Sequence, residues 1–267
     1  MTEDLQERRL LEFEIWEAAM KRSFQILYQP QVDLAQGHIT GVEALLRWES
    51  ARFGSISPAE FIPIAERLGL IPTVGQWVLD QACMAAASWP DDVRVAVNVS
   101  SLQFASDNFA EWVSRTLARA GLPASRLEIE ITETLFMQEN KAVSATLARL
   151  RETGVAIAID DFGTGYSALQ YLQRFKVDKI KIDRSFVTAM LHNEESRAIV
   201  RAIADLAEGL GVRLNAEGIE TEEQRAMLRA FGCQEGQGYL FGKAASADEI
   251  MRRLGAAHPG RAIARAS

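Results

Sequence analysis

Short β-rich segments alternate with longer helical patterns along nearly the whole chain of 267 residues. Eight apolar segments have the length and composition of strands, and they lie at residues 24–32, 39–48, 93–99, 126–132, 155–160, 178–183, 212–217 and 237–241. Helical patterns separate most of them. Eight strands with intervening helices are typical of a (β/α)₈ barrel. The alternation therefore predicts an α/β fold built on such a barrel.

The connection between the first two predicted strands is too short for a helix. Only a few residues around Gln36 and Gly37 join them. A connection of this length suits a hairpin, whose two strands are antiparallel. We therefore predict a modified TIM (β/α)₈ barrel with an antiparallel first strand.

Helix boundaries carry recognisable start and stop signals. Ser57 and Pro58 suit the N-cap and first position of one helix, and Thr221 with Gln224 predicts a capping box on another. Glycine is a common residue just after a helix. Several predicted helices end at such a residue, namely Gly69, Gly121, Gly154, Gly211 and Gly232.

The chain is expected to hold one large domain. We divide it into an entry or connector helix at 1–22, a barrel domain at 23–255 and a loosely held tail at 256–267. The first residues are charged throughout and lack the apolar core of a signal peptide. No apolar run reaches the roughly 18 residues of a membrane span. A cytoplasmic location without a membrane span is the expectation.

Charge and composition narrow the chemistry. The net charge of −7 argues against a broad surface for DNA. The two cysteines form no CxxC pair, and the three histidines have no metal-site spacing. Catalysis, if present, must therefore rest on carboxylates, amides and lysines.

Polar residues stand where the predicted strands end, and this is where a barrel carries its chemistry. They are Glu43, Asn98, Glu130, Asp160, Asp161, Lys181, Glu217 and Gln237. Carboxylates that converge on one barrel mouth repel one another unless cations bind between them. Oxygen ligands suit Mg²⁺ or Mn²⁺, and two such ions about 3.5–4 Å apart would suit cleavage of a phosphodiester.

Each of these residues also has a structural alternative when it is considered alone. The alternatives are an ion pair of Glu43 with Arg47, a pair of Glu130 with Lys181, a cap at Asn98 and a polar turn at Asp160 and Asp161. The shared position at successive strand ends favours the metal site over these alternatives. Glu128 shares a strand face with Glu130 but lies deeper, and we assign it a structural role.

Several long motifs resemble the EAL domain family. The run Glu43-Ala44-Leu45 lies within EALLRW, and the other motifs are YQPQVD, NVS at 98–100, EITE at 130–133, DDFGTGYSAL at 160–169, KIDRSF at 181–186, AEGIET at 216–221 and QGYLFGK at 237–243. They extend from about residue 24 to 243, in the order and spacing of the family. The resemblance implies hydrolysis of the bacterial messenger cyclic di-GMP to linear pGpG. The alternative on the same fold is a non-catalytic cyclic di-GMP receptor.

The resemblance also implies the metal ligands. One ion would be held by Glu43, Asn98, Glu130 and Asp160, and the other by Asp160, Asp161 and Glu217. The cofactors would be two Mg²⁺ or Mn²⁺ ions per active site, with Ca²⁺ inhibitory because its coordination shell is larger and looser. Lys181 would contact the attacking water, and Gln237 would orient a bound water or a neighbouring ligand.

Further roles follow from the same resemblance. The residues that would contact the substrate are Gln29, Leu45, Arg47 and Asp183. Glu133 would hold the loop at 160–169, which needs Gly163 and Gly165 for its backbone freedom. In the family this loop links metal binding to dimerisation, so a homodimer is expected, and the helix at 1–22 resembles a connector that follows a GGDEF or sensor domain.

Two departures from the family pattern lie outside the catalytic positions. Ala244 stands where proline is usual, and Asn215 replaces a usually apolar residue two positions before Glu217. We expect both to leave activity intact, with Asn215 altering local packing.

Overall fold

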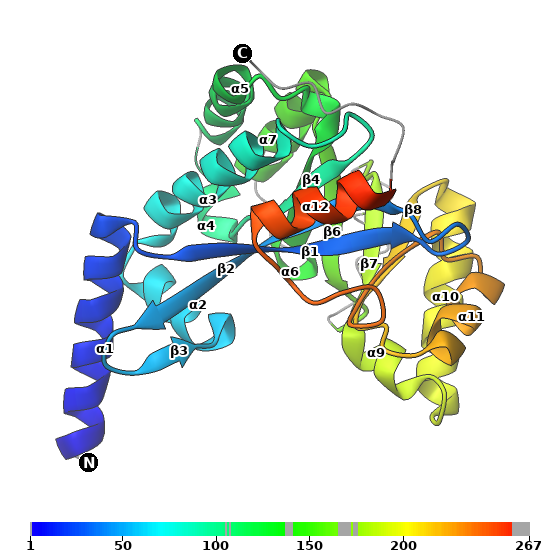
Figure 1. Cartoon of the computed structure of the whole chain (residues 1–267), viewed down its shortest axis with the longest axis horizontal. Coiled ribbons are helices and arrows are strands. Elements are labelled where there is room, and N and C mark those ends of the chain that lie inside the picture. Colours follow the sequence, from blue (N-terminus) through cyan, green and yellow to red (C-terminus); the bar gives the residue numbers. More distant parts are fainter. Residues whose placement is uncertain are drawn as a thin grey trace.

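The computed structural model describes residues 2–104, 106, 108–136, 141–164, 172 and 176–257. In this part of the chain eight strands close into a barrel (Figure 1). The strands, in chain order, are β1 Gln25–Asp33, β2 Ile39–Ser50, β4 Arg94–Asn98, β5 Leu127–Thr132, β6 Ala156–Phe162, β7 Lys179–Ile182, β8 Arg213–Ala216 and β9 Glu235–Gln237. A short strand β3, Gly54–Ile56, pairs with the far end of β2.

The first strand runs against its neighbours, as the short turn predicts. β1 is antiparallel to both β2 and β9, whereas the other neighbours around the barrel pair in parallel. The turn is held by Asp33, whose Oδ1 accepts hydrogen bonds from the backbone N–H groups of Ala35 and Gln36 at 2.8 and 2.6 Å. The predicted modified TIM barrel is confirmed.

Most helices cover the outside of the barrel (Figure 1). In the described residues the helices are α1 Thr2–Lys21, α2 Pro58–Arg67, α3 Ile71–Ala86, α4 Ser101–Phe104, α5 Phe109–Ala120, the 3₁₀ turn η1 Ala124–Arg126, α6 Glu133–Phe136, α7 Lys141–Thr153, α9 Arg184–Ala189, α10 Glu194–Leu210, α11 Glu222–Ala230 and α12 Ala247–Ala257. Helix α1 stands to one side and contacts α2 (Figure 1). The capping box of Thr221 and Gln224 starts α11 as predicted. Ser57 precedes α2 without a side-chain capping bond, and Pro58 takes the first position.

The predicted last strand at 237–241 is wrong in its bounds. β9 ends at Gln237, and the following residues turn back over Ile219, whose carbonyl accepts a hydrogen bond from Leu240 N–H at 3.1 Å. Gly238 permits this turn, because a Cβ there would lie 2.1 Å from the Ile219 carbonyl oxygen. Helix α12, which was not predicted from the sequence, then packs against β1. Most of the predicted tail at 256–267 lies outside the described residues.

Alternation along the strands separates an apolar layer from a charged one. Ile129 and Ile131 of β5 and Ile180 of β7 face the helices and are almost wholly buried. Successive strand residues point to opposite faces, so the residues between them point into the barrel. Those inward residues are charged: Glu128, Glu130, Lys179 and Lys181. The barrel interior is therefore a buried ionic core, with the apolar core outside it.

Among the described residues, no helix combines the length and apolar character that crossing a membrane requires.

Candidate active site

Two groups of carboxylates meet at the barrel mouth where the parallel strands end. Glu43, Glu130 and Asp160 form one group, and Asp160, Asp161 and Glu217 form the other. In each group the candidate ligand oxygens lie within 4.8 Å of one another. Asp160 belongs to both, so two cations bound here would share a ligand. These groups match the two carboxylate sets that the resemblance implies.

Lys181 lies at the centre of this cluster and is fully buried. Its Nζ lies 2.7 Å from Glu217 Oε1, 2.8 Å from Glu130 Oε2 and 3.1 Å from Asp160 Oδ1, and Glu43 Oε2 is 3.6 Å away. Burial disfavours the ammonium, but the surrounding carboxylates outweigh it and hold the pKa of Lys181 well above its usual value. The lysine is therefore a fixed positive charge at the site.

Glu43 of β2 is held by two amides, one at the end of β4 and one on β9. Asn98 Nδ2 donates to Glu43 Oε1 at 2.7 Å, and Gln237 Nε2 donates to Glu43 Oε2 at 2.5 Å. Burial raises the pKa of Glu43, but Lys181 and these two hydrogen bonds together bring it below its ordinary value. Glu43 is thus a carboxylate in its ionised form. Among the described residues Glu43 forms its ion pair with Lys181 and not with Arg47. The Arg47 guanidinium instead donates to the Leu46 carbonyl at 2.9 Å.

Three carboxyl groups of the site, those of Glu130, Asp161 and Glu217, have raised pKa values. Burial raises the pKa of Glu130 well above its usual value, and the charges of Glu43 and Asp160 add to it. Burial likewise raises the pKa of Glu217 to about 8 and that of Asp161 to about 6, with Asp160 contributing to both. These carboxyl groups can all be ionised at the same time only if the site holds more positive charge than that of Lys181.

The donor set fits two divalent cations. Five carboxylates face one ammonium, which leaves four formal negative charges, the number that two divalent ions neutralise. The ligands are all oxygens, the type that Mg²⁺ and Mn²⁺ prefer. Gln237 Oε1 is buried and has no hydrogen-bond partner among the described residues. An unpaired acceptor beside the cluster is suited to a bound water or a cation.

Three of the four predicted substrate residues lie on β1 and β2, the strand pair that carries Glu43. Gln29 is paired with Glu43 in the β1–β2 register, and its Oε1 accepts from Gln237 Nε2 at 3.1 Å. Leu45 and Arg47 follow on the same face of β2, half-buried. Asp183 lies just beyond β7 and caps α9, since its Oδ1 accepts from Ser185 N–H at 3.0 Å. This capping role of Asp183 was not anticipated.

The loop after β6 begins with an unusual backbone. Asp161 has a φ of 55° and Gly163 a φ of 97°, and a Cβ on Gly163 would lie 3.1 Å from the Phe186 ring. Glu133 is buried, and its Oε2 accepts a hydrogen bond from Gly163 N–H at 3.2 Å. This is the loop that Glu133 was expected to hold. Gly165 lies outside the described residues.

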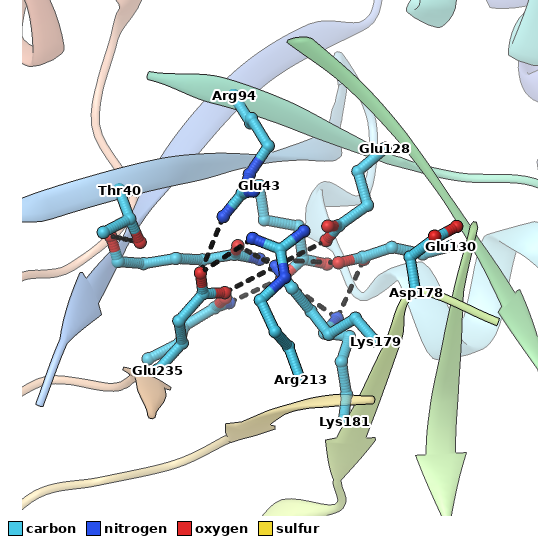
Figure 2. Close-up of polar contacts among 12 residues, drawn as sticks. Thr40, Glu43, Arg94, Glu128, Glu130, Asp178, Lys179, Lys181, Arg213 and Glu235 are labelled. Carbon is cyan, nitrogen blue, oxygen red and sulfur yellow. Dashed lines mark hydrogen bonds and ion pairs between the residues drawn. The ribbon is translucent and has the colours of Figure 1, made fainter. Parts of the chain in front are cut away.

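A second charged layer lies deeper in the barrel (Figure 2). The sequence did not predict most of its residues. Lys179 Nζ contacts Glu128 Oε1 at 2.8 Å and Glu235 Oε2 at 2.7 Å. Arg94 and Arg213 reach the other oxygen of Glu235 at 2.7 and 3.5 Å. Only Glu128 was predicted to be structural. The sequence did carry one signal. Glu128 and Glu130 are two residues apart, as are Lys179 and Lys181, so one strand supplies a residue to each layer.

Asn215 is a further buried polar residue of the interior. It pairs with Lys181 on β7 and with Glu235 on β9 in the strand register. Neither its Nδ2 nor its Oδ1 has a hydrogen-bond partner among the described residues. The departure from the usual apolar residue therefore places an unsatisfied amide between the two charged layers.

Comparisons with known proteins agree with this geometry. Residues 14–244 match the EAL domain family. A bifunctional diguanylate cyclase/cyclic di-GMP phosphodiesterase of Pseudomonas aeruginosa, MucR, is 41% identical over 94% of this chain and 37% of its own length. A cyclic di-GMP phosphodiesterase of the same organism is 41% identical over 83% of this chain and 38% of its own length.

The fold is also similar to solved structures. The solved structure of the PaMucR phosphodiesterase in complex with c-di-GMP superposes with a TM-score of 0.86, at 42% identity, over 90% of this chain and 99% of that one. The chain spans only about a third of the length of the curated relatives that it matches. The family match covers most of the chain, and the fold is shared with the solved structure. The chain belongs to the EAL domain family.

Proposed function

We propose that this chain hydrolyses one phosphodiester bond of cyclic di-GMP to give linear pGpG, using two divalent cations, Mg²⁺ or Mn²⁺. The observation that carries the proposal is the pair of carboxylate groups that share Asp160 at the barrel mouth. Relatives named as cyclic di-GMP phosphodiesterases support the choice of substrate. No expected ligand position of this chain is replaced by a non-ligating residue.

The ligands divide between the two ions. Glu43, Asn98, Glu130 and Asp160 would hold one, and Asp160, Asp161 and Glu217 would hold the other. Asn98 uses its amide nitrogen on Glu43, so it would bind through Oδ1. When bound, the cations would stabilise charge on the phosphodiester and lower the pKa of the attacking water.

The remaining residues position the reacting groups. The Lys181 ammonium, which is held at the centre of three carboxylates, would lie against the attacking water and stabilise its ionised form by its positive charge. Gln237 orients Glu43 and would present its free Oε1 to a water. Gln29, Leu45, Arg47 and Asp183 would contact the nucleotide, with Arg47 giving a positive charge to a phosphate or a donor to a base edge.

Assembly and location belong to the same proposal. The chain would work in the cytoplasm as a homodimer, with the loop after β6 linking the dimer contact to Asp160 and Asp161. Glu133 and the glycines Gly163 and Gly165 would support that loop. Because the relatives are much longer, a GGDEF or sensor domain in the same polypeptide is the proposed source of regulation.

Product analysis tests the proposal. The chain is incubated with cyclic di-GMP and Mg²⁺, and nucleotides are separated by ion-exchange chromatography. Appearance of pGpG, and its loss in Lys181→Met, supports a hydrolase. Tight binding of intact cyclic di-GMP without turnover would instead establish the receptor alternative, and neither binding nor turnover would reject both.

A further inference from the structure

Gln31 is a buried amide that lies between the two charged layers of the barrel. It projects from β1 with about 1% of its surface exposed, and it pairs with Gln237 on β9 in the strand register. Lys179 Nζ donates to Gln31 Oε1 at 3.2 Å. Gln31 Nε2 donates to Glu130 Oε1 in a long hydrogen bond of 3.4 Å. The amide thus connects the deeper layer to a ligand of the proposed metal site.

The chemistry of its partners fixes the orientation of this amide. A lysine ammonium can only donate hydrogen bonds, so the group that faces Lys179 must be the amide oxygen. The nitrogen then faces Glu130, whose other oxygen accepts from Lys181 at 2.8 Å. Lys179 is itself held by Glu128 and Glu235 and has little freedom to move. Both oxygens of Glu130 therefore accept hydrogen bonds, one from Gln31 and one from Lys181.

The neighbouring strand leaves space for this arrangement. Gly41 is the partner of Gln31 in the β1–β2 register. A Cβ at Gly41 would lie 3.1 Å from Gln31 Oε1, closer than most Cβ contacts. A side chain at residue 41 would therefore press the amide away from Lys179.

We infer that Gln31 is a positioning residue, which orients the Glu130 carboxylate for a divalent cation by linking it to the Lys179–Glu128–Glu235 layer. The inference rests on the proposed function, because it treats Glu130 as a metal ligand. A neutral amide suits this task, since it fixes the carboxylate without cancelling the negative charge that attracts the cation. A second lysine in direct contact with Glu130 would compete with the metal. Residues that orient metal ligands typically change metal affinity by about 10–100-fold.

The test measures binding of Mn²⁺ alone to the full chain, by the electron paramagnetic resonance signal of free Mn²⁺. Gln31→Met keeps the length of the side chain and removes both hydrogen bonds, and it should raise the Kd for Mn²⁺ by about 10–100-fold. Gln224→Met is the matched control, a buried glutamine of the α11 capping box. It should lower the melting temperature while leaving the Kd within about twofold of wild type, since it touches no metal ligand.

Two further measurements separate positioning from general damage. Saturating Mn²⁺ should return kcat of Gln31→Met towards wild type with an unchanged KM for cyclic di-GMP. If Gln31→Met does not fold, Gly41→Ala replaces it and should weaken Mn²⁺ binding in the same direction. Wild-type Kd in both variants would overturn the inference and leave the proposed function standing. Absence of Mn²⁺ binding by the wild-type chain would overturn both.

Discussion

Stability of the metal-free protein should fall as the pH rises from 6 to 8. Burial, with the charges of Asp160 and Glu43, raises the pKa of Glu217 to about 8 in spite of Lys181. In the unfolded chain the same group has a pKa near 4.5. Between these two values the folded protein binds a proton that the unfolded chain has released, so raising the pH favours unfolding.

The size of the effect follows from the two pKa values. At pH 6 a group with a pKa of about 8 is almost wholly protonated, and at pH 8 it is half ionised, while the unfolded group is ionised throughout. The linkage relation then gives a loss of about 2 kcal/mol over this range. For a chain of this size, the melting temperature should fall by about 4–8 °C. Glu130, whose pKa is also raised, acts in the same direction.

The assay is thermal unfolding in a chelator at pH 6, 7 and 8. Glu217→Gln is the control, because a neutral isostere removes the titration and should flatten most of the slope. Excess Mg²⁺ should also flatten or reverse it, since cations bind the ionised carboxylates. A wild-type melting temperature that is constant or rises with pH in the chelator would refute this account of the cluster.

Three other perturbations have defined outcomes. Glu43→Gln should lower turnover by at least about 100-fold. One ligand is lost, and the new amide nitrogen must face Asn98 or Gln237, both of which are donors. Near wild-type turnover would remove Glu43 from the metal site. Asn215→Val should raise the free energy of unfolding by about 1 kcal/mol, since it removes an unsatisfied buried amide; a lower melting temperature would show that the amide has a partner. Excess Ca²⁺ should inhibit Mg²⁺-dependent hydrolysis, because its larger shell fits the compact cluster poorly; unchanged turnover would contradict this.

Strand order and the residues at strand ends were predictable because both depend on local patterns. Alternating segments gave the barrel, and the short turn at Gln36 and Gly37 gave the antiparallel first strand. The carboxylate positions followed from their place after apolar runs. The two metal groups that the resemblance implied were then brought together by the parallel register.

The contacts that the sequence did not reveal depend on register between distant strands. Glu235 lies at the start of a three-residue strand, and nothing local marks it as a partner of Lys179 and Arg94. The end of β9 depends on the close approach of Gly238 to Ile219, about twenty residues away in the chain. Gln31 showed no pattern of its own, because its role arises only when β1 faces both β7 and β5.

Lys181 uncouples the folding of this barrel from metal binding. Many metal sites are unstable until the ion arrives, so folding waits for the ion. Here the chain carries its own cation at the focus of the acidic mouth, which offsets part of the repulsion while the barrel closes. Under the proposed function, the folded protein would accumulate without metal in an inactive form, and a rise in free divalent ions would activate it without refolding.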